Sequence, residues 1–208
     1  MNWNAEINCN WGSQKNEIEI KEKVIQEKAI KRKIKNQEIH FLKAKHLNDL
    51  CFEPKKNEQW RIVTEKQFNA YALILHILQK NIIEEMYLAI YRINEPTVNS
   101  IIDLIEKRKI KKANFVISNF FNQTKNPEIW ALKLKEFADK NKNVKHIYVH
   151  NHAKIVALKT NNENYFIFEG SGNMSDNARI EQYIYENNEK IFNFHKQWIE
   201  NLIKNHSK

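Results

Sequence analysis

From residue 59 onward, short apolar runs rich in β-branched and aromatic residues alternate with longer stretches of helical periodicity. The run ANFVISNFF at 113–121, for example, is mostly apolar, as expected of a strand buried inside a sheet. The predicted strands are 59–63, 86–93, 113–121, 144–150, 153–159, 165–169 and 180–185, and the predicted helices are 64–80, 96–109, 126–140 and 190–204. This order predicts an α/β fold in which helices flank a mixed β-sheet.

Residue types at the ends of these segments indicate where the helices begin. Thr64 followed by Gln67 matches a capping box, which predicts a helix start. Pro96 suits the first turn of the second helix, because a proline there loses no hydrogen bond. We expect Asn126 and Pro127 to cap and open the third helix.

The first part of the chain has a different pattern. Residues 1–14 lack periodicity and predict a loose arm. Residues 15–45 carry acid-first Glu–Lys pairs at i,i+4 spacing and predict a long exposed helix with a thin apolar stripe. The pattern breaks at 47–58, which we interpret as a linker. We therefore expect an N-terminal arm with a helical extension and linker at 1–58, and a folded domain at 59–208.

Composition excludes several classes of protein without naming a function. The 208 residues are 42% hydrophobic, which excludes global disorder, and no apolar run approaches the length of a membrane span. The two cysteines lack CxxC spacing and the first ten residues do not resemble a signal peptide, so we expect an intracellular protein. The net charge of +9 has two open interpretations, a surface that faces a polyanion or the codon bias of a Lys-, Asn- and Ile-rich chain.

Two of the three glycines lie together in the tetrapeptide Gly170-Ser171-Gly172-Asn173, at the end of a predicted strand. Glycine permits a positive φ and the close approach of backbone to a ligand. In a chain so poor in glycine, this placement predicts a binding loop.

A second group of polar residues lies one hairpin upstream, where 161–164 is the predicted turn. His152 and Lys154 are two residues apart at the start of a strand, so their side chains point to the same face. Glu181 begins the next strand and is placed to accept a hydrogen bond from the imidazole. If the hairpin pairs its strands, these residues and the tetrapeptide converge at one end of the sheet.

This set of side chains suits a phosphate. Lys154 supplies a charge, and Ser171 and Asn173 supply neutral donors to non-bridging oxygens. A histidine oriented by a carboxylate can attack phosphorus through its other ring nitrogen. The inventory requires no metal and no cofactor, and the nearby His146 and His150 lack the further ligands that a zinc site needs.

At these residues the sequence resembles the phospholipase D superfamily. The family's HKD signature is H-x-K, an Asp five positions after the Lys, and then G-[SG]-x-N. The matching residues are His152, Lys154, Gly170, Ser171 and Asn173, and Glu181 is similar to the family's downstream Glu. The resemblance covers about 59–208, implies a phospholipase D-like fold, and is to short single-motif members found in bacteria and their phages.

The resemblance implies a metal-independent phosphodiesterase, and a nuclease in particular. In the family, the histidine of one motif forms a phosphohistidine and the histidine of a second motif protonates the leaving group. This chain has one motif only, so the resemblance implies a homodimer with two copies of His152 at a two-fold axis. Two Lys154 and two Asn173 side chains would then clamp the phosphoryl oxygens of a nucleic acid.

Two departures from the signature leave other functions open. Lys159 stands where the signature has its Asp, and the stretch from there to Gly170 is about four residues longer than the family pattern. A catalytically silent nucleic-acid-binding module and a phosphodiesterase directed at phospholipids both remain alternatives.

Four further features have two interpretations each. Arg92 and Asn119, near the ends of predicted strands, are secondary candidates that border the site or have a structural role. Phe120–Phe121 belongs to the core or stacks on a nucleobase. Lys107–Lys112 is a solvated helix end or contacts a nucleic-acid backbone.

Overall fold

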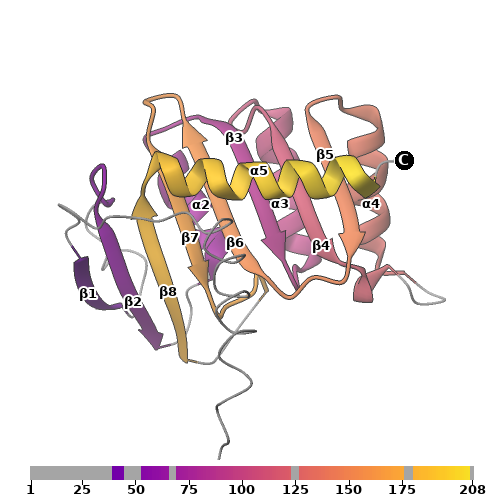
Figure 1. Ribbon diagram of the computed structural model, residues 1–208. Coiled ribbons are helices and arrows are strands. Elements are labelled where there is room, and N and C mark those ends of the chain that lie inside the picture. Colours follow the sequence, from indigo (N-terminus) through magenta and orange to yellow (C-terminus); the bar gives the residue numbers. More distant parts are fainter. Residues whose placement is uncertain (1–38, 45–52, 66–68, 123–126, 176–179, 207–208) are drawn as a thin grey trace, which may run out of the picture. The chain divides into compact units, whose positions relative to one another are not determined.

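The computed structural model describes residues 39–44, 53–65, 69–122, 127–175 and 180–206, all of which belong to the unit Gln37–Lys208 (Figure 1). Within them, eight strands form one sheet in the order β1-β2-β8-β7-β6-β3-β4-β5. The strands are β1 (Ile39–Ala44), β2 (Gln59–Glu65), β3 (Ile83–Ile90), β4 (Ala113–Ser118), β5 (Val144–Val149), β6 (Lys154–Thr160), β7 (Tyr165–Gly170) and β8 (Ile180–Asn187). The β3–β4, β4–β5 and β1–β2 pairs are parallel and the remaining pairs are antiparallel, which confirms the predicted mixed sheet.

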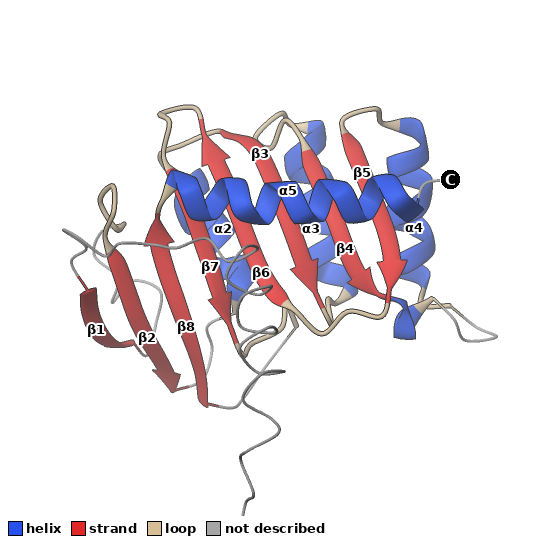
Figure 2. Cartoon of the chain, viewed as in Figure 1, coloured by secondary structure: helices blue, strands red, loops and turns tan. Residues whose placement is uncertain are grey.

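Helices cover both faces of this sheet. The helices α2 (Ala70–Leu78), α3 (Glu95–Glu106) and α4 (Ile129–Lys140) lie on one face, and α5 (Glu189–His206) crosses the other (Figure 2). None of the described helices combines the length and the apolar character needed to cross a membrane. The predicted α/β class is therefore confirmed for the described part of the chain.

The central strand β3 is a continuous apolar run from Met86 to Ile90, and its surroundings show why. Met86, Leu88 and Ile90 are buried in the core beneath α2, α3 and α4, whereas Tyr87 and Ala89 are buried in the core beneath α5. Side chains alternate between the two faces of a strand, so a strand covered on both sides needs apolar residues at every position.

The helix predicted at residues 15–45 is wrong over its last residues. Residues Ile39–Ala44 form β1, which pairs in parallel with β2 and so extends the sheet into the segment predicted to be helical. Pairing with β2 satisfies backbone groups that a helix would have satisfied internally. The predicted arm at 1–14 and the rest of the predicted helix lie outside the described residues.

The predicted capping box is also wrong. Thr64 lies in β2, where it pairs with Glu181 of β8, and Gln67 lies outside the described residues. The helix α2 begins six residues later than predicted, and its cap is Asn69, whose Oδ1 accepts a hydrogen bond of 3.1 Å from the Ala72 N–H. Strand pairing across the sheet overrode a local signal.

The two proline predictions had different outcomes. Pro96 lies in the first turn of α3, which Asn94 caps by accepting a 3.1 Å hydrogen bond from the Thr97 N–H. The helix α4 begins at Ile129, two residues after Pro127, with no side-chain cap. Asn126 lies outside the described residues.

Candidate active site

The residues that match the HKD signature lie where β3, β6 and β7 meet. Ile90, the last residue of β3, pairs with Lys154, the first residue of β6. The next residue of β6, Ile155, pairs with Glu169 near the end of β7, and the tetrapeptide that begins at Gly170 follows at once. The β6–β7 hairpin turn at 161–164, with Glu163 at a φ of 54°, brings the two segments together.

The imidazole and the ammonium contact each other. Lys154 Nζ lies 3.3 Å from His152 Nδ1 and donates a 3.0 Å hydrogen bond to the His152 carbonyl oxygen. The ring of Tyr91, the first residue after β3, lies against both groups, 4.7 Å from the imidazole between centroids and 5.7 Å from the ammonium. Burial lowers the pKa of Lys154, and the carboxylate of Glu181 partly opposes that shift.

Asn151 holds the segment that carries the histidine, a role that the sequence did not reveal. Its Nδ2 donates to the carbonyl oxygens of Ile90 (3.1 Å) and Val116 (3.0 Å), and its Oδ1 accepts a 2.9 Å hydrogen bond from the Ala153 N–H. One side chain thus ties β3 and β4 to the turn that precedes β6. The asparagine directly before the H-x-K triplet was the available signal.

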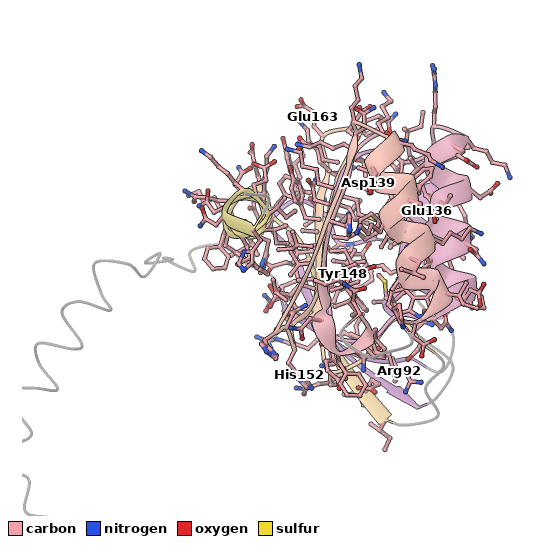
Figure 3. The ribbon with its side chains drawn as sticks, turned by 90° about the vertical axis from the view of Figure 1, so that its right-hand side faces the viewer. Arg92, Glu136, Asp139, Tyr148, His152 and Glu163 are labelled. Atoms are coloured by element: carbon pink, nitrogen blue, oxygen red, sulfur yellow. The ribbon has the colours of Figure 1, made fainter. Side chains whose placement is uncertain are left out.

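Asn173 is held by the segment after β3. Its Oδ1 accepts a 3.1 Å hydrogen bond from the Arg92 N–H, and the Arg92 carbonyl accepts a 3.0 Å hydrogen bond from the Met174 N–H. The amide oxygen is therefore turned toward the backbone, and Nδ2 is the end that can donate to a ligand. The secondary candidate Arg92 thus contributes backbone groups, and its exposed side chain lies at the same end of the domain as His152 (Figure 3).

Ser171 and Glu181 form a pair beside these groups. The Ser171 hydroxyl donates to Glu181 Oε2 and accepts a 3.1 Å hydrogen bond from the Gln182 N–H. Glu181 is buried, with 8% of its surface exposed. The sequence predicted that Glu181 would face the imidazole and that Ser171 would donate to phosphate, whereas here the single hydroxyl proton goes to Glu181 and Lys154 faces the imidazole.

The structure requires glycine at positions 170 and 172 for a reason other than the expected positive φ or close approach to a ligand. Neither has a positive φ. A Cβ at Gly170 would overlap the Tyr183 ring and the Gln182 carbonyl oxygen, and a Cβ at Gly172 would overlap the Tyr183 hydroxyl. The close approach that requires glycine is therefore that of the Tyr183 side chain from β8.

The end of β4 differs from the prediction. The strand stops at Ser118, and Asn119–Phe121 forms a short 3₁₀ helix, η2. Ser118 Oγ accepts a 3.3 Å hydrogen bond from the Phe120 N–H. The secondary candidate Asn119 is buried, and its carbonyl closes the turn by accepting a 3.0 Å hydrogen bond from the Asn122 N–H.

Other titratable residues lie apart from this group. Lys159, which stands where the signature has its Asp, lies near the far end of β6 with its ammonium 5.7 Å from the Tyr165 ring. His195 is buried, and its Nε2 lies 2.5 Å from Glu169 Oε1 while Nδ1 accepts a 3.0 Å hydrogen bond from Trp198 Nε1. Among the residues that the structure describes, no three His, Cys, Asp or Glu side chains are grouped to hold a metal ion.

Comparison with known proteins gives structural likenesses only. No family model matches the sequence, and no curated protein matches it. Among solved structures, the chain is similar to Nuc from Salmonella typhimurium, a phospholipase D family member, with 15% identity, a TM-score of 0.49, and coverage of 69% of this chain and 93% of that one. It is also similar to NucT from Helicobacter pylori, with 16% identity, a TM-score of 0.47, and coverage of 71% and 97%. A variant of yeast tyrosyl-DNA phosphodiesterase 1 matches with 14% identity, a TM-score of 0.34, and coverage of 60% and 27%.

Proposed function

We propose that this chain is a metal-independent phosphodiesterase of the phospholipase D superfamily and that its substrate is a nucleic acid. One observation carries the proposal: His152, Lys154 and Asn173 gather around the two residues that follow β3. Tyr91 contacts the first two, and the Arg92 N–H holds the third. An exposed imidazole next to an ammonium and an oriented amide donor is suited to a phosphodiester.

Lys154 and Asn173 bind the phosphate in this proposal. The ammonium neutralises one non-bridging oxygen and the Asn173 Nδ2 donates to another, so the protein's own groups supply the charge stabilisation. Glu181 favours the protonated form of Lys154 against the effect of burial, and Ser171 holds Glu181 in place. Lys159 is remote from these groups, so its presence in place of the signature's Asp removes nothing from around His152.

The contact between Lys154 and His152 selects the tautomer of a neutral imidazole. An ammonium only donates, so Nδ1 accepts in this contact and the proton of a neutral ring lies on Nε2. Attack by Nε2 requires the opposite tautomer. When Lys154 moves onto a phosphate oxygen, Nδ1 is released to carry the proton and Nε2 becomes the nucleophile.

A second copy of the chain supplies the general acid. Nε2 of one His152 forms a bond to phosphorus while the bond to the leaving oxygen breaks, and that oxygen takes the proton from Nε2 of His152 in the other copy. Water then attacks the phosphorus, the P–Nε2 bond to the first His152 breaks, and the water gives a proton to the second imidazole, which restores both side chains. The side chain of His152 is exposed in its own subunit, as this arrangement requires.

The proposal is tested by hydrolysis of single- and double-stranded DNA and RNA with EDTA present. His152→Gln should lower the rate about 10²- to 10⁴-fold, whereas His206→Gln, an exposed histidine at the end of α5, should not. Loss of wild-type activity on chelation, or activity that survives His152→Gln, would contradict the mechanism. Salt-sensitive binding without turnover would instead identify a silent binding module.

The dimer has its own test. Wild-type chains are mixed with increasing amounts of His152→Ala chains and allowed to exchange subunits. Activity should fall as the square of the wild-type fraction, because only a dimer of two wild-type chains holds two imidazoles. A linear fall, or a fully active monomer in light scattering, would contradict a shared site.

A further inference from the structure

An exposed aromatic ring lies next to the proposed active site. Phe120, in the 3₁₀ turn η2 after β4, exposes 61% of its surface. Its ring centroid lies 6.5 Å from that of Tyr91, and the Tyr91 ring in turn lies 4.7 Å from the imidazole of His152. A single intervening ring therefore connects Phe120 to the proposed nucleophile.

The position of Phe120 is fixed although the ring is exposed. Its N–H donates to Ser118 Oγ, and its ring packs edge-on against Phe121 with 5.2 Å between centroids. Phe121 contacts both Tyr91 (6.0 Å) and Trp130 (5.7 Å). Since Trp130 is buried with 4% exposure, the cluster is anchored in the core, and Phe120 presents a preorganised ring to solvent.

We propose that Phe120, supported by Tyr91 and Phe121, stacks on an unpaired nucleobase of the substrate and so gives the enzyme a preference for single-stranded nucleic acid. This inference rests on the proposed function, because the phosphate of the same substrate would lie on Lys154 and Asn173. A fixed ring beside a phosphate site matches the two parts of a nucleotide, a flat base and a charged linkage. The exposed side chain of Arg92 lies at the same end of the domain and adds positive charge for a neighbouring phosphate (Figure 3).

The single-strand preference follows from the cost of exposing a base face. In a duplex, each base is stacked between its neighbours, and pulling it out to meet Phe120 costs free energy. In a single strand that cost is small, so the contact with Phe120 adds to affinity. A nucleobase of any type has a π-face, so we expect little sequence preference.

The test compares Phe120→Ala, Phe120→Leu and Phe120→Trp. The substrates are one short single-stranded oligonucleotide, its blunt duplex, and the same single strand with abasic sites. Leucine keeps an apolar side chain without a π-face, and tryptophan keeps the stacking surface. The matched control is Ile129→Ala on α4, because Ile129 is the same kind of exposed apolar residue, at 72% exposure, and is not part of the ring cluster.

The alanine and leucine variants should each raise KM for the single strand by about tenfold, with kcat nearly unchanged and with tryptophan restoring the wild-type value. The duplex and the abasic strand should respond little, and Ile129→Ala should behave as wild type. An equal loss on all three substrates, or a leucine variant as good as wild type, would overturn the inference. So would binding to phosphatidylglycerol vesicles that depends on Phe120 while oligonucleotide binding does not.

Direct binding separates this inference from the proposed function. Fluorescence anisotropy of the labelled single strand is measured in the His152→Ala background, where no turnover is needed. If the wild type cleaves nothing and Phe120→Ala still weakens single-strand binding, the phosphodiesterase proposal fails and the stacking role stands. If the wild type cleaves and Phe120→Ala binds and cleaves normally, the stacking role alone fails.

Discussion

Lys154 Nζ lies 3.3 Å from His152 Nδ1, so the ammonium of the proposed site faces the lone pair of the imidazole. Because an ammonium only donates, this contact selects the Nε2–H tautomer of a neutral ring. In the proposed function, the same ammonium neutralises the phosphate. The charge on Lys154 would then serve both to hold the imidazole in one tautomer and to bind the substrate.

The alkaline limb of the pH profile should report that charge. Burial lowers the pKa of Lys154 from 10.5, and Glu181 opposes the shift. Activity that needs the ammonium is lost as the pH rises through the lowered pKa. Glu181→Gln removes the opposing carboxylate and lowers the pKa further, so the alkaline limb of kcat/KM should move to lower pH.

The matched control for that experiment is Glu84→Gln, which removes a carboxylate paired with Lys111 at 2.7 Å near the other end of β3. It should leave the limb where it is. A limb that stays in place in Glu181→Gln, or moves to higher pH, would show that Glu181 does not support the charge of Lys154.

Gly172→Ala should destabilise the fold by about 1–3 kcal/mol, because its Cβ would overlap the Tyr183 hydroxyl. Tyr183→Phe removes that hydroxyl, so Gly172→Ala should cost less in the Tyr183→Phe background. Gly170→Ala is the control, since its Cβ meets the Tyr183 ring and the Gln182 carbonyl oxygen, which Tyr183→Phe leaves in place. Urea unfolding of the single and double variants measures the coupling, and equal relief for both glycines would contradict this account.

Tyr87 lies at the centre of a charged network between β3 and α5. Its hydroxyl lies 2.7 Å from Glu85 Oε2 and 2.6 Å from Glu200 Oε1, and the ammonium groups of Lys112 and Lys196 lie over its ring. Burial alone would raise the pKa of Glu85, but hydrogen bonds from Lys196 and Tyr87 outweigh it and hold the pKa below 4.5. The network therefore stabilises the fold above that pH and weakens as Glu85 is protonated.

Tyr87→Phe should lower the free energy of unfolding by about 1.5–3 kcal/mol at pH 7, since the single hydroxyl proton is donated to a charged carboxylate, that of Glu85 or Glu200. Tyr148→Phe is the matched control and should cost about 0.5–1.5 kcal/mol, because the Tyr148 hydroxyl donates to the neutral Ala131 carbonyl at 2.9 Å. As the pH falls well below 4.5, the cost of Tyr87→Phe should shrink toward that of Tyr148→Phe. A cost for Tyr87→Phe that does not change with pH would contradict the role of the carboxylates.

Local sequence predicted secondary structure well where a pattern is typical of only one kind of element. The strands buried on both faces were recognisable from their apolar runs, although the strand predicted at 86–93 is Ile83–Ile90 and begins three residues earlier, through Glu84 and Glu85. Thr64 shows the opposite case, since its capping pattern is local whereas its pairing with Glu181 joins residues far apart in the chain. The pattern within one segment carries no information about a distant strand that can pair with it. For the same reason, the residues of β1 were predicted to be helical although they pair with β2.

By itself, the sequence determined the α/β class, the order of the strands and α-helices from residue 59 onward, and the placement of His152, Lys154 and the glycine-containing tetrapeptide at strand ends. These follow from local spacing, because side-chain alternation and apolar runs are properties of consecutive residues. Only the tertiary structure decided that Lys154 faces the imidazole, that Ser171 gives its proton to Glu181, and that Tyr183 requires the glycines. Each of these depends on which atoms of neighbouring strands lie within contact distance of one another. Such hydrogen bonds and steric overlaps between strands exist only once the sheet has formed.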